Sequence, residues 1–253
     1  MMLRLQLLGR VRLSYETENK NIHLKRQSAT LLAYLAMHRD CDHAQDTIIE
    51  QFWPECDPAR GRSNLSSALW RLRRAIGPRS STLIKPSIHG ATGISEDIPI
   101  WLDVKAFECG IMATLGTSLV KSVDCRLATL EQGLALYHGE LMPGWYDDWI
   151  LAERERLQGL YLGGLLQLMA HRAEQGLLDA AIATGRQILK VEPLHETTHR
   201  RLIELYMASG QPAAATRQYQ DCFGLLLEEL GVAPCSETQA TYAKLRQTSA
   251  HPA

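Results

Sequence analysis

The sequence lacks several short motifs that often mark an enzyme. It has no GxxxxGK phosphate-binding loop, no GxSxG nucleophile motif and no CxxC pair. Its histidines are scattered, and none has a nucleophile as an evident partner. We therefore expect a protein that is not an enzyme and that needs no cofactor.

Long hydrophobic runs and paired cysteines are also absent. No stretch approaches the roughly 18 to 20 apolar residues of a membrane span, and the first ten residues alternate apolar side chains with Arg4 and Gln6, which favours a strand over a signal peptide. The six cysteines are scattered, as is typical of reduced thiols. His38, Cys41 and His43 lie close together without a fourth ligand at zinc spacing. The sequence predicts a soluble cytoplasmic protein without a metal and without membrane contact.

Acidic residues are missing from the stretch 59–77, which is the most informative part of the chain. On a helix, Leu65, Leu69, Leu72 and Ile76 fall at i, i+4, i+7 and i+11 and form an apolar stripe. The opposite face is cationic and polar, with Trp70 at its edge, and consists of Arg60, Ser63, Asn64, Ser67, Arg71 and Arg74. Arginine and asparagine side chains suit base edges and phosphates in a DNA major groove. The alternative is a basic helix that is simply solvated, although surface helices usually mix both signs.

The elements before this helix follow a helix-turn-helix order. Strands are predicted at 3–8, 11–15 and 22–24, and a helix is predicted at 25–39. A short helix then begins with Asp46 as its cap and ends at Pro54. Asp57 is predicted to cap the basic helix. The basic helix is the second helix of the motif, and the second helix is the one expected to bind DNA.

Further basic residues lie near this motif. Lys25 and Arg26 begin a predicted helix, where positive charges oppose the helix dipole. Two alternatives could compensate these charges: a bound phosphate, or solvent together with nearby acidic residues. Residues 82–85 and 91–95 form a predicted hairpin that follows the basic helix like a wing, with Lys85 and His89 near its tip. His89 is interpreted more readily as a solvated turn residue than as a base contact.

The first 90 residues and the remainder of the chain differ in net charge and in their predicted secondary structure. Residues 1–90 hold fourteen lysines and arginines against eight acidic residues, whereas the remainder holds thirteen against twenty. Beyond residue 103 the chain is predicted to be nearly all helical. Gly176 and Gly210 are 34 residues apart, and so are Ala181 and Ala215, which is the tetratricopeptide period. The fold class is therefore predicted as mainly α with a small β component.

Three segments carry a resemblance to a known family. They are LLAYLAMHRD at 31–40, IIEQFWPECDPARGRSNLSSALWRLRRAIG at 48–77 and WLDVKAF at 101–107. With the order of elements, they resemble the winged helix of OmpR-type regulators and, more specifically, the SARP family of antibiotic regulatory proteins. The wing KPSIHGATGISED departs from the glycine-rich hairpin ending in tyrosine that many members have. The resemblance implies a winged helix-turn-helix DNA-binding domain at 1–96 and a helical, TPR-like bacterial transcriptional activation domain at 103–249.

The preferred hypothesis is a sequence-specific transcriptional activator. Its base contacts are predicted to be Asn64, Ser67 and Arg71. Trp70 is expected either to pack into the edge of the core or to lie on a DNA sugar, with packing slightly preferred. Phosphate contacts are predicted for Arg60, Arg62, Arg73, Arg74 and Lys85. The resemblance implies binding to direct repeats at promoters as a homodimer or in tandem, and recruitment of RNA polymerase through its sigma factor and alpha subunit. The alternatives are a helical-repeat adaptor or a small-molecule-responsive regulator whose winged domain does not act by sequence-specific DNA binding.

Overall fold

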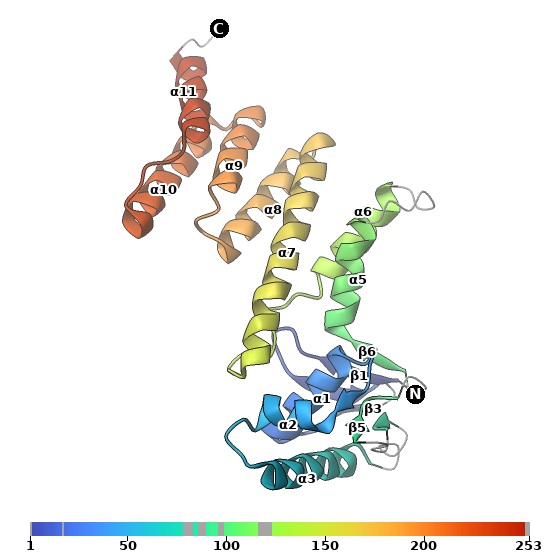
Figure 1. Cartoon of the computed structure of the whole chain (residues 1–253). Helices are drawn as coiled ribbons and strands as arrows, with labels where there is room; N and C mark the ends of the chain where they lie inside the picture. Colours follow the sequence, from blue (N-terminus) through green and yellow to red (C-terminus); the bar gives the residue numbers. More distant parts are fainter. Residues whose placement is uncertain are drawn as a thin grey trace. The chain divides into compact units, whose positions relative to one another are not determined.

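The computed structural model describes residues 2–16, 18–77, 83–85, 90–95, 99–115 and 123–250 (Figure 1). The chain divides into two compact units. The first comprises Met1–Ser118 and Gln132–Gln158, and the second comprises Leu119–Glu131 and Gly159–Ala253. Helices dominate the described residues and strands are few, as the sequence predicted. The predicted domain division into 1–96 and 103–249 stays a prediction.

A four-stranded sheet lies in the first unit, in the order β3-β2-β1-β6. Its strands are β1 (Leu3–Gln6), β2 (Arg12–Tyr15), β3 (Glu18–Asn21) and β6 (Ile100–Leu102). β1 pairs antiparallel with β2 and parallel with β6. The third strand predicted at 22–24 is wrong, because the polar segment 18–21 pairs with β2 instead. An edge strand is held by backbone hydrogen bonds, so hydrophobic patterning did not mark it.

Three helices accompany this sheet: α1 (Arg26–Met37), α2 (Gln45–Phe52) and α3 (Pro58–Ile76). α1 buries Leu31, Leu32 and Leu35 completely, and α3 packs against both α1 and α2. The prediction that Asp46 caps α2 is wrong, because the helix begins at Gln45 and Ala44 occupies the cap position without a side-chain hydrogen bond. Asp46 lies in the first turn, where a negative charge favours the helix dipole.

The segment after α3 is described only in part. Ile84 and Ile94 form an antiparallel bridge, and the Lys85 amide donates to the Gly93 carbonyl at 3.0 Å, as the predicted hairpin requires. β5 (Ala91–Thr92) also pairs with β4 (His43–Ala44), a segment for which no strand was predicted. The base of the hairpin is therefore joined to the segment between α1 and α2.

The first unit also contains α5 (Asp103–Leu115), which begins with a buried acid. Asp103 Oδ2 accepts hydrogen bonds from the amides of Leu7 and Leu8 at 2.8 and 2.9 Å, and its Oδ1 accepts one from Val104 at 2.8 Å. Burial raises the pKa of this carboxyl, against the opposing effect of the three amides. The helices α6 (Val123–Leu134) and α7 (Asp148–Glu174) follow, and the division between the two units falls within each of them, after Glu131 and after Gln158.

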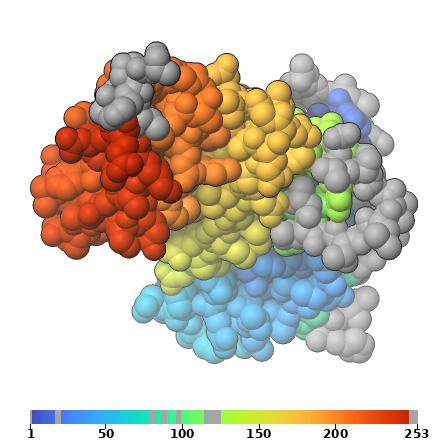
Figure 2. All heavy atoms as spheres, turned by 90° about the horizontal axis from the view of Figure 1, so that it is seen from above, coloured from blue at the N-terminus to red at the C-terminus, as the bar shows by residue number. Residues whose placement is uncertain are grey.

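The second unit contains α8 (Leu178–Val191), α9 (Glu196–Ala208), α10 (Pro212–Leu230) and α11 (Ser236–Ala250). α9 packs against α8, α10 and α11, and the orange and red spheres of α9 to α11 form one packed group in Figure 2. No helix among the described residues is both long and apolar enough to cross a membrane.

The predicted 34-residue repeat is confirmed in this unit by the helix ends. Gly176 and Gly210 have φ of 73° and 72°, a left-handed conformation that glycine adopts readily. The residues after them donate to equivalent carbonyls, Leu177 to Arg172 at 2.9 Å and Gln211 to Tyr206 at 2.8 Å. Ala181 and Ala215 are both fully buried, as close packing within each helix pair requires.

Candidate nucleic-acid interface

The orientation of α3 follows from its two ends and its buried stripe. Asp57 Oδ1 accepts hydrogen bonds from the amides of Ala59 and Arg60, both at 3.0 Å, and Pro58 occupies the first helical position. The predicted cap is confirmed, and the helix ends at Ile76, with Gly77, the last residue of the stretch 59–77, in the C-cap position. The four apolar residues of the stripe are each at most 5% exposed: Leu65, Leu69, Leu72 and Ile76.

Gly61 contributes a contact that the sequence analysis missed. A Cβ atom added at this position would lie 2.3 Å from Ile49 Cγ2 on α2. The two helices therefore approach closely because residue 61 has no side chain. The sequence does indicate this contact: Gly61 lies inside the predicted helix, four residues before Leu65, and so falls on the same face as the apolar stripe.

The outer side of α3 carries a second line of residues at the same spacing. Ser63, Ser67, Trp70 and Arg74 repeat the stripe two positions earlier, which is about 200° around the helix. All four are exposed, and Trp70 is 57% exposed. The prediction that Trp70 packs in the core is therefore wrong. The Arg74 guanidinium carbon lies 5.3 Å from the centre of the Trp70 ring, so this line ends in a cation–π pair.

The other predicted contacts on α3 differ in their surroundings. Arg60, Arg62 and Arg71 are exposed, whereas Asn64 and Arg73 are half-buried. Arg62 lies 3.6 Å from Asp46, and Asn64 Nδ2 donates to Cys56 Sγ at 3.7 Å. Asn64 is thus turned partly toward its own unit.

A groove of about 440 Å³ joins the C-terminal half of α3 to the start of α1. Its lining includes Lys25, Trp70, Arg71 and Arg74, together with Ser28, whose Oγ donates to the Ala68 carbonyl at 3.4 Å. The first turn of α1 has no acidic residue, and Lys25 gives its amides no side-chain cap. Uncapped amides and three cations make this concave surface suitable for an anion.

Two predicted contacts, Arg26 and Lys85, lie away from this groove. The Arg26 guanidinium lies 3.6 Å from Asp147 and over the Trp145 ring, so its charge is directed to the segment before α7. Lys85 Nζ forms an ion pair with Asp42 at 2.8 Å. His89 falls outside the described residues.

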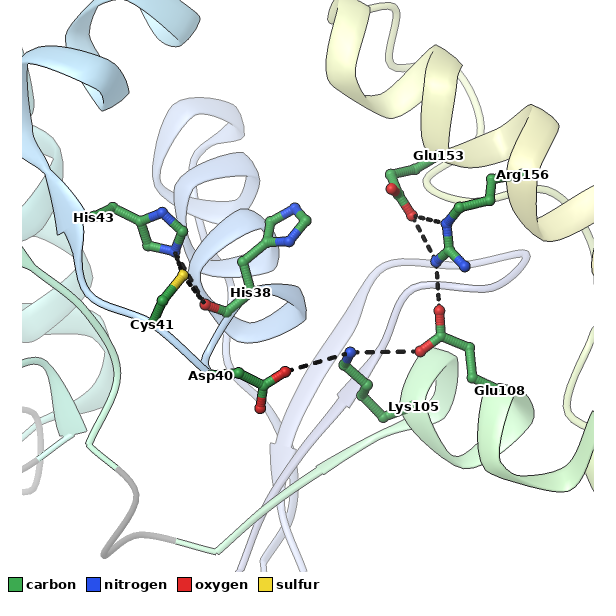
Figure 3. Close-up of polar contacts among 8 residues, drawn as sticks. All are labelled: His38, Asp40, Cys41, His43, Lys105, Glu108, Glu153 and Arg156. Atoms are coloured by element: carbon green, nitrogen blue, oxygen red, sulfur yellow. Dashed lines mark hydrogen bonds and ion pairs between the residues drawn. The ribbon is translucent and has the colours of Figure 1, made fainter. Parts of the chain in front are cut away.

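The His38–Cys41–His43 group lies at the end of α1, beside a chain of ion pairs (Figure 3). His43 Nε2 donates to the His38 carbonyl at 3.0 Å and lies 3.8 Å from Cys41 Sγ. No group of three potential metal ligands is assembled among the described residues. Burial lowers the pKa of His38, which keeps its ring neutral at pH 7.

The ion pairs of Figure 3 connect Asp40, which follows α1, with α5 and α7 within the first unit. Lys105 Nζ lies 3.9 Å from Asp40 and 3.5 Å from Glu108, and Arg156 pairs with Glu108 and with Glu153. Opposite charges alternate along this chain, so we interpret it as a support for helix packing.

One match to an enzyme motif escaped the sequence analysis: His195, Glu196 and His199 have the HExxH spacing of a zinc-binding helix. The structure gives these side chains other roles. His195 Nδ1 caps α9, and Glu196 Oε1 accepts from the Cys235 amide at 2.7 Å. His199 is buried, and its two ring nitrogens bond to the Pro193 carbonyl and to Gln218 at 2.8 and 2.7 Å. The histidine nitrogens thus bond within the second unit.

Comparison with known proteins gives the family. Residues 102–246 match the bacterial transcriptional activator domain. The chain belongs to that family. The regulatory protein AfsR of Streptomyces griseus is 28% identical over 239 residues, covering 93% of this chain and 24% of that protein. The transcriptional regulatory protein MoaR1 of Mycobacterium bovis is 25% identical, covering 85% of this chain and 70% of that protein.

A solved structure shares the fold of nearly the whole chain. Mycobacterium tuberculosis EmbR, in complex with a low-affinity phosphopeptide, superposes with a TM-score of 0.73 at 16% identity, covering 99% of this chain and 66% of EmbR. The predicted resemblance to the SARP family of transcriptional regulators is confirmed by these matches. The chain spans about a quarter of the length of its Streptomyces relative.

Proposed function

We propose that this protein is a sequence-specific transcriptional activator that lays α3 in the major groove of promoter DNA. The observation that carries the proposal is the outer side of α3, which has arginine, serine and tryptophan exposed, no acidic residue, and a buried stripe directly opposite. A helix held in this way presents its polar side to a groove about 12 Å wide.

The side chains of α3 divide into two proposed roles. Ser67 and Arg71 contact base edges near the middle of the helix, Asn64 joins them after a rotation away from Cys56, and Trp70 adds an apolar contact. Phosphates are held by the remaining cations of the surface: Lys25, Arg60, Arg62, Arg73 and Arg74. Lys85 adds a further phosphate contact from the hairpin. Its contribution to DNA affinity is smaller, because its ammonium group is paired with Asp42. Base contacts specify the sequence, whereas phosphate contacts fix the register.

The two parts of the chain then have separate tasks in the cytoplasm. Residues 1–96 bind DNA, and residues 103–249 contact the transcription machinery, which we propose to be the sigma factor and alpha subunit of RNA polymerase. Promoter direct repeats are the proposed targets, bound by two copies in tandem or as a homodimer. The stacked helices of the second unit support this, because helical repeats offer extended surfaces for other proteins.

Selection of bound duplexes from a random DNA pool tests the proposal. The purified protein is expected to enrich a defined sequence and to lose affinity steeply with salt, with a log–log slope of several units. Enrichment of no sequence, with weak binding even at low salt, would instead favour the adaptor function.

Two substitutions then separate the proposed roles. Arg71→Ala is expected to cost about 1–3 kcal/mol on the selected duplex and to relax one base position, because it removes a base contact. Lys85→Ala is expected to weaken binding to selected and random duplexes equally. If both variants lose the same affinity on both duplexes, the division into base and phosphate contacts is wrong.

A further inference from the structure

A second cationic cavity lies in the first unit, built from the sheet and not from α3. It measures about 320 Å³ and is lined by Gln6, Leu8, Gly9, Arg10, Arg12 and His138. Its lining contains two arginines, one histidine and one amide, and no acidic residue. None of these residues was needed for the proposed DNA contacts.

The sheet register gives this cavity one of its walls. Gln6 and Arg12 face each other in the antiparallel pair of β1 and β2, so their side chains lie on the same side of the sheet. The neighbouring pair, Leu5 and Leu13, points to the opposite side and is buried. The side that carries Gln6 and Arg12 therefore faces away from the core.

Two glycines bring a distant segment to this wall. Gly9 has a φ of 81°, and its amide donates to the Glu140 carbonyl at 2.9 Å. A Cβ atom at Gly9 would lie 3.0 Å from the backbone carbon and oxygen of His138, and one at Gly139 would lie 3.2 Å from the Gly9 Cα. Only residues without side chains permit this approach, which places His138 beside Arg10.

Among the described residues, no carboxylate is paired with the positive charges of the cavity. Within the part of the chain that the structure describes, no ion pair involves Arg10, Arg12 or His138. The neighbouring Asp103 interacts electrostatically with His138, yet its oxygens are already occupied by three backbone amides. Glu140 lies 3.7 Å from Arg154. The nearby acids thus leave the two guanidinium groups available.

We propose that this cavity binds the phosphate group of a small phosphorylated metabolite. Arginine forks are suited to phosphate oxygens, and the Gln6 amide and His138 ring supply further donors. The cavity lies at the lower end of the size range of small-ligand sites, which fits a compact anion. Since the cavity is built from the sheet and the segment after α6, this ligand would couple the two without touching α3.

Titration calorimetry on the full chain tests the proposal, with inorganic phosphate and pyrophosphate as probes and chloride at equal ionic strength as the reference. Both probes are expected to bind saturably, with pyrophosphate the tighter. Arg10→Gln combined with Arg12→Gln is expected to weaken binding at least about tenfold, because it removes two charge-assisted donors. Arg217→Gln, which changes an exposed arginine of α10, is the matched control and should bind like the unaltered protein.

A parallel measurement of DNA binding distinguishes a site for a small metabolite from a site for the phosphates of a duplex. The double variant should bind DNA as the Arg217→Gln control does, whether or not that binding is sequence-specific. His138→Gln, which leaves both strands unchanged, gives a second variant of the same cavity and should weaken phosphate binding by about threefold. The proposal is overturned if phosphate binds no better than chloride, if the cavity variants bind it unchanged, or if the double variant also weakens duplex binding.

Discussion

Gly61→Ala tests whether the closeness of α2 and α3 sets the position of α3. The added methyl group would lie 2.3 Å from Ile49 Cγ2, well inside van der Waals contact. Ile49 is buried and β-branched, so its χ1 has little freedom and the methyl group cannot turn away. One of the two helices must therefore move.

The expected magnitude comes from two opposing effects. Overpacking of this kind costs about 1–3 kcal/mol, whereas alanine is about 1 kcal/mol better than glycine inside a helix. The net expectation is a loss of about 1 kcal/mol in the free energy of unfolding of the first unit, or about 3 °C in its Tm.

A double-mutant cycle makes this test decisive. In an Ile49→Ala background the obstructing methyl group is gone, so Gly61→Ala should become stabilising by about 0.5–1 kcal/mol. Urea unfolding followed by circular dichroism and tryptophan fluorescence measures all four proteins. Stabilisation by Gly61→Ala in the unaltered background, or the same effect in both backgrounds, would refute the reasoning.

Two further predictions concern buried charges of the first unit. Arg154→Met should cost about 3 kcal/mol of stability, because Arg154 donates at 2.5–2.7 Å to three backbone carbonyls of the 141–145 segment. The control is Arg156→Met, which changes a half-exposed arginine and should cost less than about 1 kcal/mol. Equal losses of the two variants in urea unfolding would contradict this prediction. Burial raises the pKa of Asp103 in the folded state, so the folded protein holds the carboxyl proton more tightly than the unfolded chain does. Stability should therefore fall as pH rises from about 4 through the raised pKa of Asp103. Asp103→Asn should abolish that decline, and unfolding of both proteins between pH 4 and 7 checks it. If the unaltered protein instead gains stability over Asp103→Asn as pH rises, the amide hydrogen bonds outweigh burial and the prediction is wrong.

The parts of the fold that follow from local chemistry were predictable. The Asp57 cap, the leucine stripe of α3 and the glycine–alanine spacing of the repeat each depend on residues close together in the sequence. Helix periodicity could also have placed Trp70 outside, since it lies seven residues after Ser63.

Features that depend on distant partners could not be predicted. β4 exists because it pairs with β5, almost 50 residues later. Arg26 was expected to be compensated either by a phosphate or by solvent and local acids, but Asp147, more than 100 residues away, pairs with its side chain. The cavity of Arg10, Arg12 and His138 likewise forms only when the turn at Gly9 meets the segment after α6.

The central claim is that the outer side of α3 lies against DNA, and photo-crosslinking tests it most directly. A photoreactive benzoylphenylalanine placed at Ser67, in the middle of that side, should crosslink to the selected duplex, and the same group at Glu155, which is exposed on α7, should not. Both variants must first retain saturable binding to the duplex. Equal crosslinking from both positions, or none from Ser67 while binding persists, would contradict the account.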